Sequence, residues 1–316
     1  MTQVVVNRIA QVASLNQDLT YSEESFSGIS AGEVESNYGL WMSPFFGKNI
    51  QKLRKTVPGY QSTYYGVAVG FDGAINDQLV LGAAVSTIQT DIKHKDYNMG
   101  DRTKISSNII YVYGTYSFND HWFVQNVTSV GKSRVKKREL RKESLQYNTA
   151  KADYNSSFIA TEVLTGHKYS LKKINITPTL AVNYTKSGDI SFSETGTQYQ
   201  NLIVKGKGGH QLATTFGMIL DNTYKLSNGL EIKPEIYADV GYTILTPKAD
   251  LDIRLAKNPT EKLKTNSVKP DKMLYSFGGN ITGIISKSYE INVGYDCKLA
   301  DKFVAHQGTL RLRVNF

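Results

Sequence analysis

Hydrophobic and polar residues alternate through the end of the chain, from Gly308 to Phe316. In an extended strand, one side is apolar and consists of Leu310, Leu312, Val314 and Phe316. The other side carries the guanidinium groups of Arg311 and Arg313. This pattern predicts a strand with lipid on its apolar face and a water-filled lumen on its arginine face. The rest of the chain must then close a barrel, because an open sheet edge cannot lie in hydrocarbon.

A second segment, Leu230–Leu245, alternates even more regularly. Its odd-numbered positions are mostly charged and include Glu231, Lys233, Glu235 and Asp239. Its even-numbered positions are apolar, as in a strand that separates two different environments. A soluble barrel or sandwich would place the apolar face in a core instead, so this segment by itself leaves both interpretations open.

Alternation of this kind predicts an all-β fold with twelve strands. They are approximately Tyr38–Phe46, Thr63–Asp72, Gln78–Thr87, Lys104–Ser117, Trp122–Arg134, Ser156–Tyr169, Ile174–Lys186, Gln211–Leu226, Leu230–Leu245, Met273–Ser286, Tyr289–Leu299 and Ala305–Phe316. Most are longer than the roughly 9–11 residues that cross a bilayer at barrel tilt.

The connections between these strands alternate in length. Those after even-numbered strands are short, such as Phe118–His121 and Lys287–Ser288. Those after odd-numbered strands are mostly long, such as Lys136–Asn155, Ser187–His210 and Thr246–Lys269. Outer-membrane barrels have short periplasmic turns and long outer loops, whereas soluble meanders have no reason to sort loops in this way. The connections therefore favour a membrane barrel with both of its ends in the periplasm.

Residues 1–37 have a different character. Val5, Ile9, Val12 and Asn16 fall at helical spacing, which predicts a helix over Gln3–Asp18. The segment Ser22–Gly32 is rich in Ser, Glu and Gly and predicts a flexible linker. The lumen of a twelve-stranded barrel is wider than side chains alone can fill, so one helix would fit inside it.

The composition narrows the class of protein. The chain has 316 residues, 40% of them hydrophobic, and a mean hydropathy of −0.33. No stretch approaches the roughly 20 apolar residues of a transmembrane helix. Twenty Tyr residues suit the two membrane–water boundaries, where the ring lies in lipid and the hydroxyl stays wet. A tyrosine-rich soluble β protein would have the same composition.

The formal net charge of +9 suggests anionic neighbours. Its densest part is Lys132–Lys142, a basic run without the interleaved aromatic residues of a nucleic-acid groove. We therefore expect no nucleic-acid partner, and interpret the run as a loop or strand extension near lipopolysaccharide phosphates. Lys205-Gly206-Lys207-Gly208-Gly209 lacks the spacing of a phosphate loop and is expected to be a mobile outer loop.

Other candidate chemistry is sparse. The five His residues show no metal-ligand spacing, and Cys297 is the single cysteine, so we expect no metal, cofactor or disulfide. Met1 is not followed by a basic segment and an apolar core, as a secretory signal would require. Because an outer-membrane barrel must be exported, we expect this chain to be the carboxyl-terminal piece of a longer precursor.

Several segments resemble a known family. These are the opening Gly39-Leu40-Trp41, the run from Tyr65 to Asp72, the run from Leu81 to Ser86, and the terminal Phe316. Over about Tyr38–Phe316 the chain resembles the translocator β-domain of autotransporters, the type V secretion family. The opening Y-G-L-W-x-S-P-F and the Lys-, Asn- and Ile-rich composition look most like its rickettsial surface-antigen branch.

The resemblance implies a twelve-stranded outer-membrane barrel (residues 38–316) preceded by a linker whose pore helix occupies the lumen (residues 1–37). It also implies a passenger domain exported to the cell surface, and a carboxyl-terminal strand recognised by the barrel-assembly machinery. Leu310, Leu312, Val314 and Phe316 are the matching assembly positions. Some members of the family cut the linker at an Asn, but their E-V-N-N-L sequence is absent here.

The inward side of the predicted barrel holds two groups of candidate residues. Gly66, Ala68 and Gly70 would either make room for the helix or relieve crowding in a curved sheet. The charged set would either clasp the helix through Arg8 or line a hydrated pore, and consists of Glu231, Lys233, Glu235, Asp239, Arg311 and Arg313.

Three functions are compatible with the sequence. The first is a monomeric translocator without enzymatic activity, surrounded by outer-membrane lipid. The second is a barrel that cuts its own linker, with an Asn of the helix placed against Glu235 or Asp239. The third is a stand-alone porin or adhesin whose outer loops bind a ligand.

Overall fold

The computed structural model describes residues 38–54, 57–143, 145–171, 174–227, 229–246, 250–263, 272–286 and 288–316. The predicted pore helix and linker, with Val5, Arg8, Ile9, Val12 and Asn16, lie outside these described residues. Within the described part of the chain, no helix is long and apolar enough to cross a membrane.

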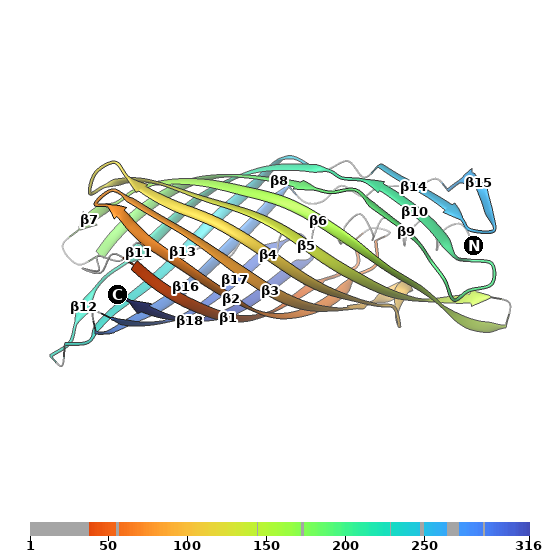
Figure 1. Cartoon of the computed structure of the whole chain (residues 1–316), viewed down its shortest axis with the longest axis horizontal. Helices are drawn as coiled ribbons and strands as arrows, with labels where there is room; N and C mark the ends of the chain where they lie inside the picture. The colour runs from red at the N-terminus through yellow and green to blue at the C-terminus, as the bar shows by residue number, and fades with distance from the viewer. Residues whose placement is uncertain are drawn as a thin grey trace.

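The described chain forms a closed antiparallel barrel (Figure 1). Its strands are β1 (Tyr38–Gln51), β2 (Tyr60–Asn76), β3 (Leu79–His94), β4 (Arg102–Ser117), β5 (Trp122–Glu143), β6 (Gln146–His167), β8 (Ile174–Ser187), β11 (His210–Asp221), β13 (Glu231–Leu245), β16 (Met273–Ser286), β17 (Tyr289–Ala300) and β18 (Phe303–Asn315). Each pairs with the next along the chain, which confirms the predicted all-β fold of twelve barrel strands.

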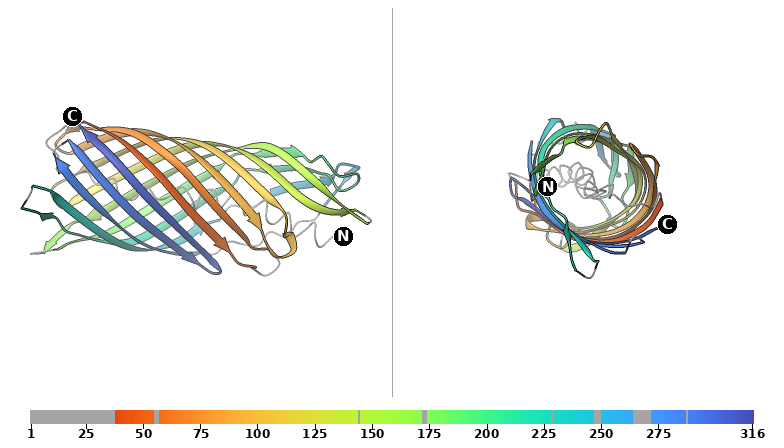
Figure 2. Two further views of the ribbon diagram at one scale, coloured as in Figure 1. Left: turned by 90° about the horizontal axis from the view of Figure 1, so that it is seen from below. Right: turned by 90° about the vertical axis from the view of Figure 1, so that its left-hand side faces the viewer.

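The ring closes where the first strand meets the last (Figure 2, right). The pairing of β1 with β18 runs from Gly39 opposite Asn315 to Gln51 opposite Phe303. The seam ends with two backbone hydrogen bonds, from Tyr38 N to Phe316 O at 3.3 Å and from Phe316 N to Tyr38 O at 3.0 Å. The start of β1 and the carboxyl terminus therefore lie at the same end of the barrel.

Side chains alternate between the two faces of the barrel wall. On β1, Leu40 and Met42 are exposed while Trp41 is buried, and the other strands repeat this pattern. Trp41 of β1 donates a hydrogen bond to Tyr113 of β4, three strands away, which is possible only across the concave side. The buried positions therefore face the interior. The exposed apolar positions form the outer wall, as the alternation in sequence predicts.

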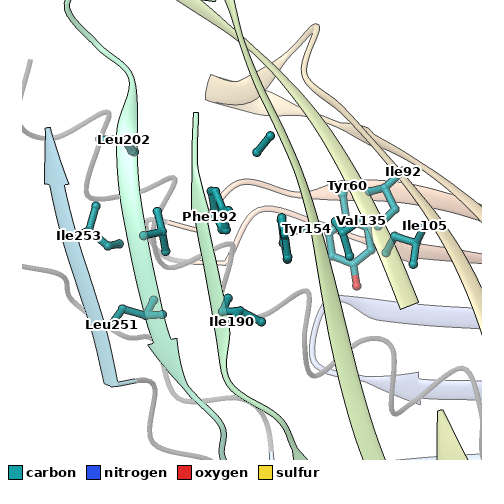
Figure 3. Packing of buried hydrophobic residues seen from close by; sticks show 12 residues of the cluster. Tyr60, Ile92, Ile105, Val135, Tyr154, Ile190, Phe192, Leu202, Leu251 and Ile253 are labelled. Atoms are coloured by element: carbon teal, nitrogen blue, oxygen red, sulfur yellow. The ribbon is translucent and has the colours of Figure 1, made fainter. Parts of the chain in front are cut away.

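Two long connections build a second sheet. Its strands are β9 (Ile190–Ser193), β10 (Leu202–Lys207), β14 (Asp250–Leu255) and β15 (Asn258–Lys262), in the order β15-β14-β10-β9. This loop sheet packs through Phe192, Val204 and Ile253 against inward side chains of β2 to β6, including Tyr60 and Tyr154 (Figure 3). The residues Lys205–Lys207 belong to β10, so the expectation of a mobile loop there is wrong.

Strands β5 and β6 are much longer than the sequence predicted. The segment Lys136–Asn155 was expected to be a loop, but β5 and β6 remain paired out to Glu143 opposite Gln146. Val135, Ala152 and Tyr154 face inward along this extension and are buried beneath the loop sheet. The extension is stable as strand because a second layer removes its apolar face from water.

Short elements complete the fold. They are the 3-10 helix η1 (Asp96–Asn98) between β3 and β4, and the small strands β7 (Tyr169–Leu171) and β12 (Tyr224–Lys225). The two small strands lie at the end of the barrel that holds the carboxyl terminus (Figure 1).

Candidate functional site

The candidate site is the inner wall of the barrel together with its closing seam. A hydrogen-bonded cluster ties the seam to the wall behind it. The carboxylate of Asp72 on β2 is 2% exposed and accepts hydrogen bonds from three side chains. They come from Trp41 Nε1 at 3.1 Å, Tyr113 OH at 2.8 Å, and Arg313 Nη1 at 3.0 Å.

This cluster spans four strands, because Trp41, Asp72, Tyr113 and Arg313 lie on β1, β2, β4 and β18. Arg313 also bonds Asp72 through Nη2 at 2.5 Å, which makes the pair bidentate. Bidentate arginine–carboxylate pairs combine strength with a fixed geometry. The cluster therefore holds the last strand in register with β1 from the lumen side.

On the last strand, the predicted assembly positions face outward. Leu310, Leu312 and Val314 are each about two-fifths exposed, and Phe316 is 65% exposed. The ring of Phe316 lies 6.3 Å from that of Phe71, measured between centroids. The terminal residue thus adds to an aromatic surface on the outside of the barrel at its carboxyl-terminal end.

The charged positions of β13 and β18 lie on the inner face. Glu235 and Asp239 alternate with exposed apolar neighbours, and so do Arg311 and Arg313, whereas Glu231 and Lys233 alternate with the half-buried Ile232 and Pro234. Glu235 accepts a hydrogen bond from Asn280 Nδ2 at 2.9 Å, and Asp239 from Ser276. Glu231 pairs with Lys225 at 2.9 Å near the end of the barrel. The structure thus spreads these residues along the wall, with Glu235 and Asp239 each bonded to the neighbouring strand.

The small residues of β2 favour one of the two interpretations that the sequence left open. Ala68 is fully buried, and a Cβ added at Gly70 would lie 2.3 Å from a ring atom of Trp41. A Cβ at Gly66 would lie 2.6 Å from the ring of Phe45. The space beside these glycines is filled by aromatic rings of the adjacent strand, so the glycines relieve crowding within the wall.

The opposite end of the lumen holds a charge network that sequence reasoning missed. Along β5, Lys137, Glu139 and Arg141 face inward and are almost completely buried. Glu139 accepts from both Lys137 and Arg141 at 2.7 Å, and Arg141 reaches Glu194 after β9 at 2.9 Å. Burial raises the pKa of the Glu194 carboxyl. A period-two interpretation of K-x-E-x-R-x-E would have placed these residues on one face.

The next inward residue, Glu143, fastens the connection between β9 and β10. Its carboxylate accepts the backbone N–H groups of Gln198 at 3.0 Å, Tyr199 at 2.8 Å and Gln200 at 3.0 Å. These hydrogen bonds, that of Gln198 foremost, lower the pKa of Glu143 to about 2. The loop sheet is therefore held on the wall by charged contacts as well as by its apolar core.

A closed, lipid-compatible ring with a polar inner wall defines a transmembrane β-barrel. Residues 40–296 match the family model of the autotransporter β-domain. Outer membrane protein A of Rickettsia conorii is 34% identical over 99% of this chain and 16% of that protein. Outer membrane protein B of Rickettsia rickettsii is 28% identical over 88% of this chain and 17% of that protein. The chain belongs to the autotransporter β-domain family.

Solved structures give the same fold. The translocator domain of NalP from Neisseria meningitidis has a TM-score of 0.74 at 11% identity and covers 97% of this chain and 98% of its own. The transport unit of AIDA-I from Escherichia coli has a TM-score of 0.60 at 14% identity, with 96% of this chain and 98% of its own covered. This chain is thus an outer-membrane barrel of the translocator type, and the resemblance to the rickettsial branch is confirmed.

Proposed function

We propose that this chain anchors a longer protein in the outer membrane and serves in the export of an amino-terminal passenger domain to the cell surface. The closed barrel of the autotransporter β-domain family is the observation that carries this proposal. The chain spans only about one sixth of the length of the relatives it matches, which leaves room for a large passenger. The family is one of transport barrels, and export rather than catalysis is the activity that we propose.

The proposal divides the chain into a linker with a pore helix, residues 1–37, and the barrel, residues 38–316. Val5, Arg8, Ile9, Val12 and Asn16 would face the inner wall, where Glu235 and Arg311 offer charged partners. Single-channel conductance in planar bilayers tests this division by comparing the full chain with one that begins at residue 38. Low conductance of the full chain and a large, stable pore in the truncated chain are expected. Equal, large conductance in both would place the helix elsewhere.

The barrel-assembly machinery and lipid are the other proposed partners. Leu310, Leu312, Val314 and Phe316 would form the strand that the machinery recognises, and their exposure on the outer wall supports this role. We expect Phe316→Ala to reduce the amount of folded barrel in the outer membrane at least severalfold in cells, while the purified variant still refolds in detergent. Phe118→Ala, an exposed aromatic in a turn, is the control. An equal loss for both variants would contradict a specific signal.

Cleavage of the linker inside the barrel is a second candidate, favoured by the inward acids Glu235 and Asp239. Mass spectrometry of the precursor from cells would then find a new amino terminus within residues 1–37. That terminus would disappear in a Glu235→Gln, Asp239→Asn double variant. An uncut linker in cells with the native barrel would exclude this activity.

A further inference from the structure

The outer wall of β2 to β6 changes from apolar to cationic along the strands. Five outward residues that are paired neighbour to neighbour form an apolar row: Val69, Val85, Ile110, Val130 and Ile159. The next outward row, farther from the carboxyl-terminal end, is Val67, Thr87, Asn108, Lys132 and Ser157. Lys132 is therefore the first charged outward residue on β5, after the uncharged Trp122, Val124, Asn126, Thr128 and Val130.

A groove of about 660 Å³ lies across these two rows. Val67, Val69, Val85 and Ile110 supply its apolar lining, and Lys132 stands at its rim. On β5, the nine residues from Trp122 to Val130 precede this rim. Since about nine to eleven residues of a tilted strand cross a bilayer, Lys132 lies where lipid tails give way to headgroups.

Beyond the groove, the same face is strongly basic. At the end of the barrel opposite the carboxyl terminus, its exposed outward residues include eight cations. They are Lys93, Arg102, Lys104, Lys132, Arg134, Lys136, Arg138 and Lys151. Among the described outward residues at this end of β2 to β6, Asp91 and Asp153 are the only acids, and their carboxylates bond Arg102 and Arg134. The acids of the buried network, such as Glu139, lie on the other side of the wall and contribute nothing to this face.

Cations also stand directly opposite one another across the strands. Lys104 faces Lys136, while Arg138 faces Arg102 on one side and Lys151 on the other. Like charges in such positions destabilise a sheet. An anionic ligand on this face would remove the repulsion, whereas a neutral one would not.

We propose that the outer wall of β2 to β6 binds a phosphorylated, multiply acylated lipid of the outer leaflet. One acyl chain lies in the groove beside Val85 and Ile110, and the phosphates lie on Lys132 and Lys136. These two lysines are four residues apart on one strand, about 13 Å, so a headgroup with two phosphates can engage both. The inference rests on the proposed function and on the orientation expected from the connection lengths, with the long connections outside the cell.

Native mass spectrometry of the full chain, refolded in detergent with equal amounts of bisphosphoryl and monophosphoryl lipid A, tests the proposal. The native chain should retain the bisphosphoryl lipid about tenfold more strongly, since losing one charged contact is a factor of that order. Lys132→Glu with Lys136→Glu should abolish the preference. Asn108→Trp, which fills the groove but keeps both lysines, should lower the retention of both lipids.

The matched control is Lys205→Glu with Lys207→Glu, two exposed lysines on β10 of the loop sheet, outside this wall. Equal retention of the two lipids by the native chain, or the same loss in the control, would overturn the proposal. Displacement of the lipid by millimolar inorganic phosphate would reduce the site to one for soluble anions and overturn it as well. If charge reversal impairs refolding, Lys132→Gln with Lys136→Gln is used in its place.

The orientation is tested separately, by labelling Tyr97→Cys on intact cells in a Cys297→Ala background. Tyr97 is 65% exposed in the connection between β3 and β4. Labelling from outside is expected. Lipid binding in detergent does not depend on the direction of insertion, so failure of the orientation and failure of the lipid site give different results.

Discussion

At the scale of single residues, buried polar groups join strands that lie apart in the chain, alongside the buried apolar clusters. Asp72 is the clearest case, because its carboxylate is bonded to Trp41, Tyr113 and Arg313 and these partners come from both sides of the seam. A buried charge of this kind is stabilising only while all of its partners are in place. The same residue is ordinary in sequence, where it is the last position of the expected strand Thr63–Asp72 and precedes a glycine.

We predict that Asp72→Asn lowers the free energy of unfolding by about 2 kcal/mol, because the arginine loses its charged acceptor inside the wall. Urea unfolding of the refolded barrel in lipid vesicles, followed by tryptophan fluorescence, measures this change. Asp120→Asn, in the exposed turn between β4 and β5, should leave the free energy almost unchanged. A similar loss for both variants would show that the cluster has no special role.

A crowded glycine gives a second prediction at this scale. A Cβ at Gly131 would lie 2.0 Å from the ring of Phe158 across the inner wall. Gly131→Val should therefore destabilise the barrel by about 1–3 kcal/mol, the usual cost of overpacking. The double variant Gly131→Val, Phe158→Ala should recover part of that loss in the same unfolding assay. Independent, additive effects would contradict direct contact.

At the scale of elements, the loop sheet stands apart from the ring of barrel strands. It connects to the wall through the apolar cluster around Phe192 and Ile253, and through Arg141 and Glu143 of β5. These contacts join segments far apart in the chain. They convert two connections that would otherwise be long loops into an ordered second layer.

The hydrogen bonds of Glu143 make this layer sensitive to acid. Its folded-state pKa of about 2 lies below the ordinary value of 4.5, so its contribution is present above pH 4.5 and disappears as the pH falls toward 2. We predict that the amides of Gln198, Tyr199 and Gln200 lose hydrogen-exchange protection over this range, after correction for intrinsic rates. Glu143→Gln should weaken their protection already at pH 7. Unchanged protection in the variant at pH 7 would refute the contact.

At the scale of the whole molecule, two features are independent: the closure of the ring of strands, and the covering of the lumen by the loop sheet at the end opposite the carboxyl terminus. Every barrel strand pairs with two barrel neighbours. The loop sheet is a separate sheet, and its strands take part in none of these pairings. Closure removes the exposed strand edges that would otherwise invite aggregation. The loop sheet instead covers inward side chains and narrows the opening.

We therefore predict that a chain with residues 190–207 and 250–263 replaced by short Gly-Ser linkers still folds as a barrel. Its band should shift on heating in an SDS gel, as that of the native barrel does. In a background that begins at residue 38, its single-channel conductance should exceed that of the chain with an intact loop sheet. Loss of the heat-dependent shift would mean that the loop sheet is needed for closure.

The sequence by itself determined the parts of this protein that depend on local alternation. Leu310, Leu312 and Val314 opposite Arg311 and Arg313 specify a strand between lipid and a wet interior, since successive side chains point to opposite faces. The spacing of such strands and the sorting of connection lengths were enough for the barrel, whereas the family was identified from the resemblance of segments such as Gly39-Leu40-Trp41. The membrane positions of β1, β13 and β18 follow from the same rule.

The tertiary structure decided what depends on contacts between distant segments. The continuation of β5 and β6 through Lys136–Asn155, the order of the loop sheet, and the seam cluster of Asp72 arise only when residues far apart are brought together. A run of alternating charges looks the same in a solvated loop as in a strand that buries one face. Only the layer packed on that face separates Glu139, buried among cations, from the exposed Lys136 and Lys142, each three residues away.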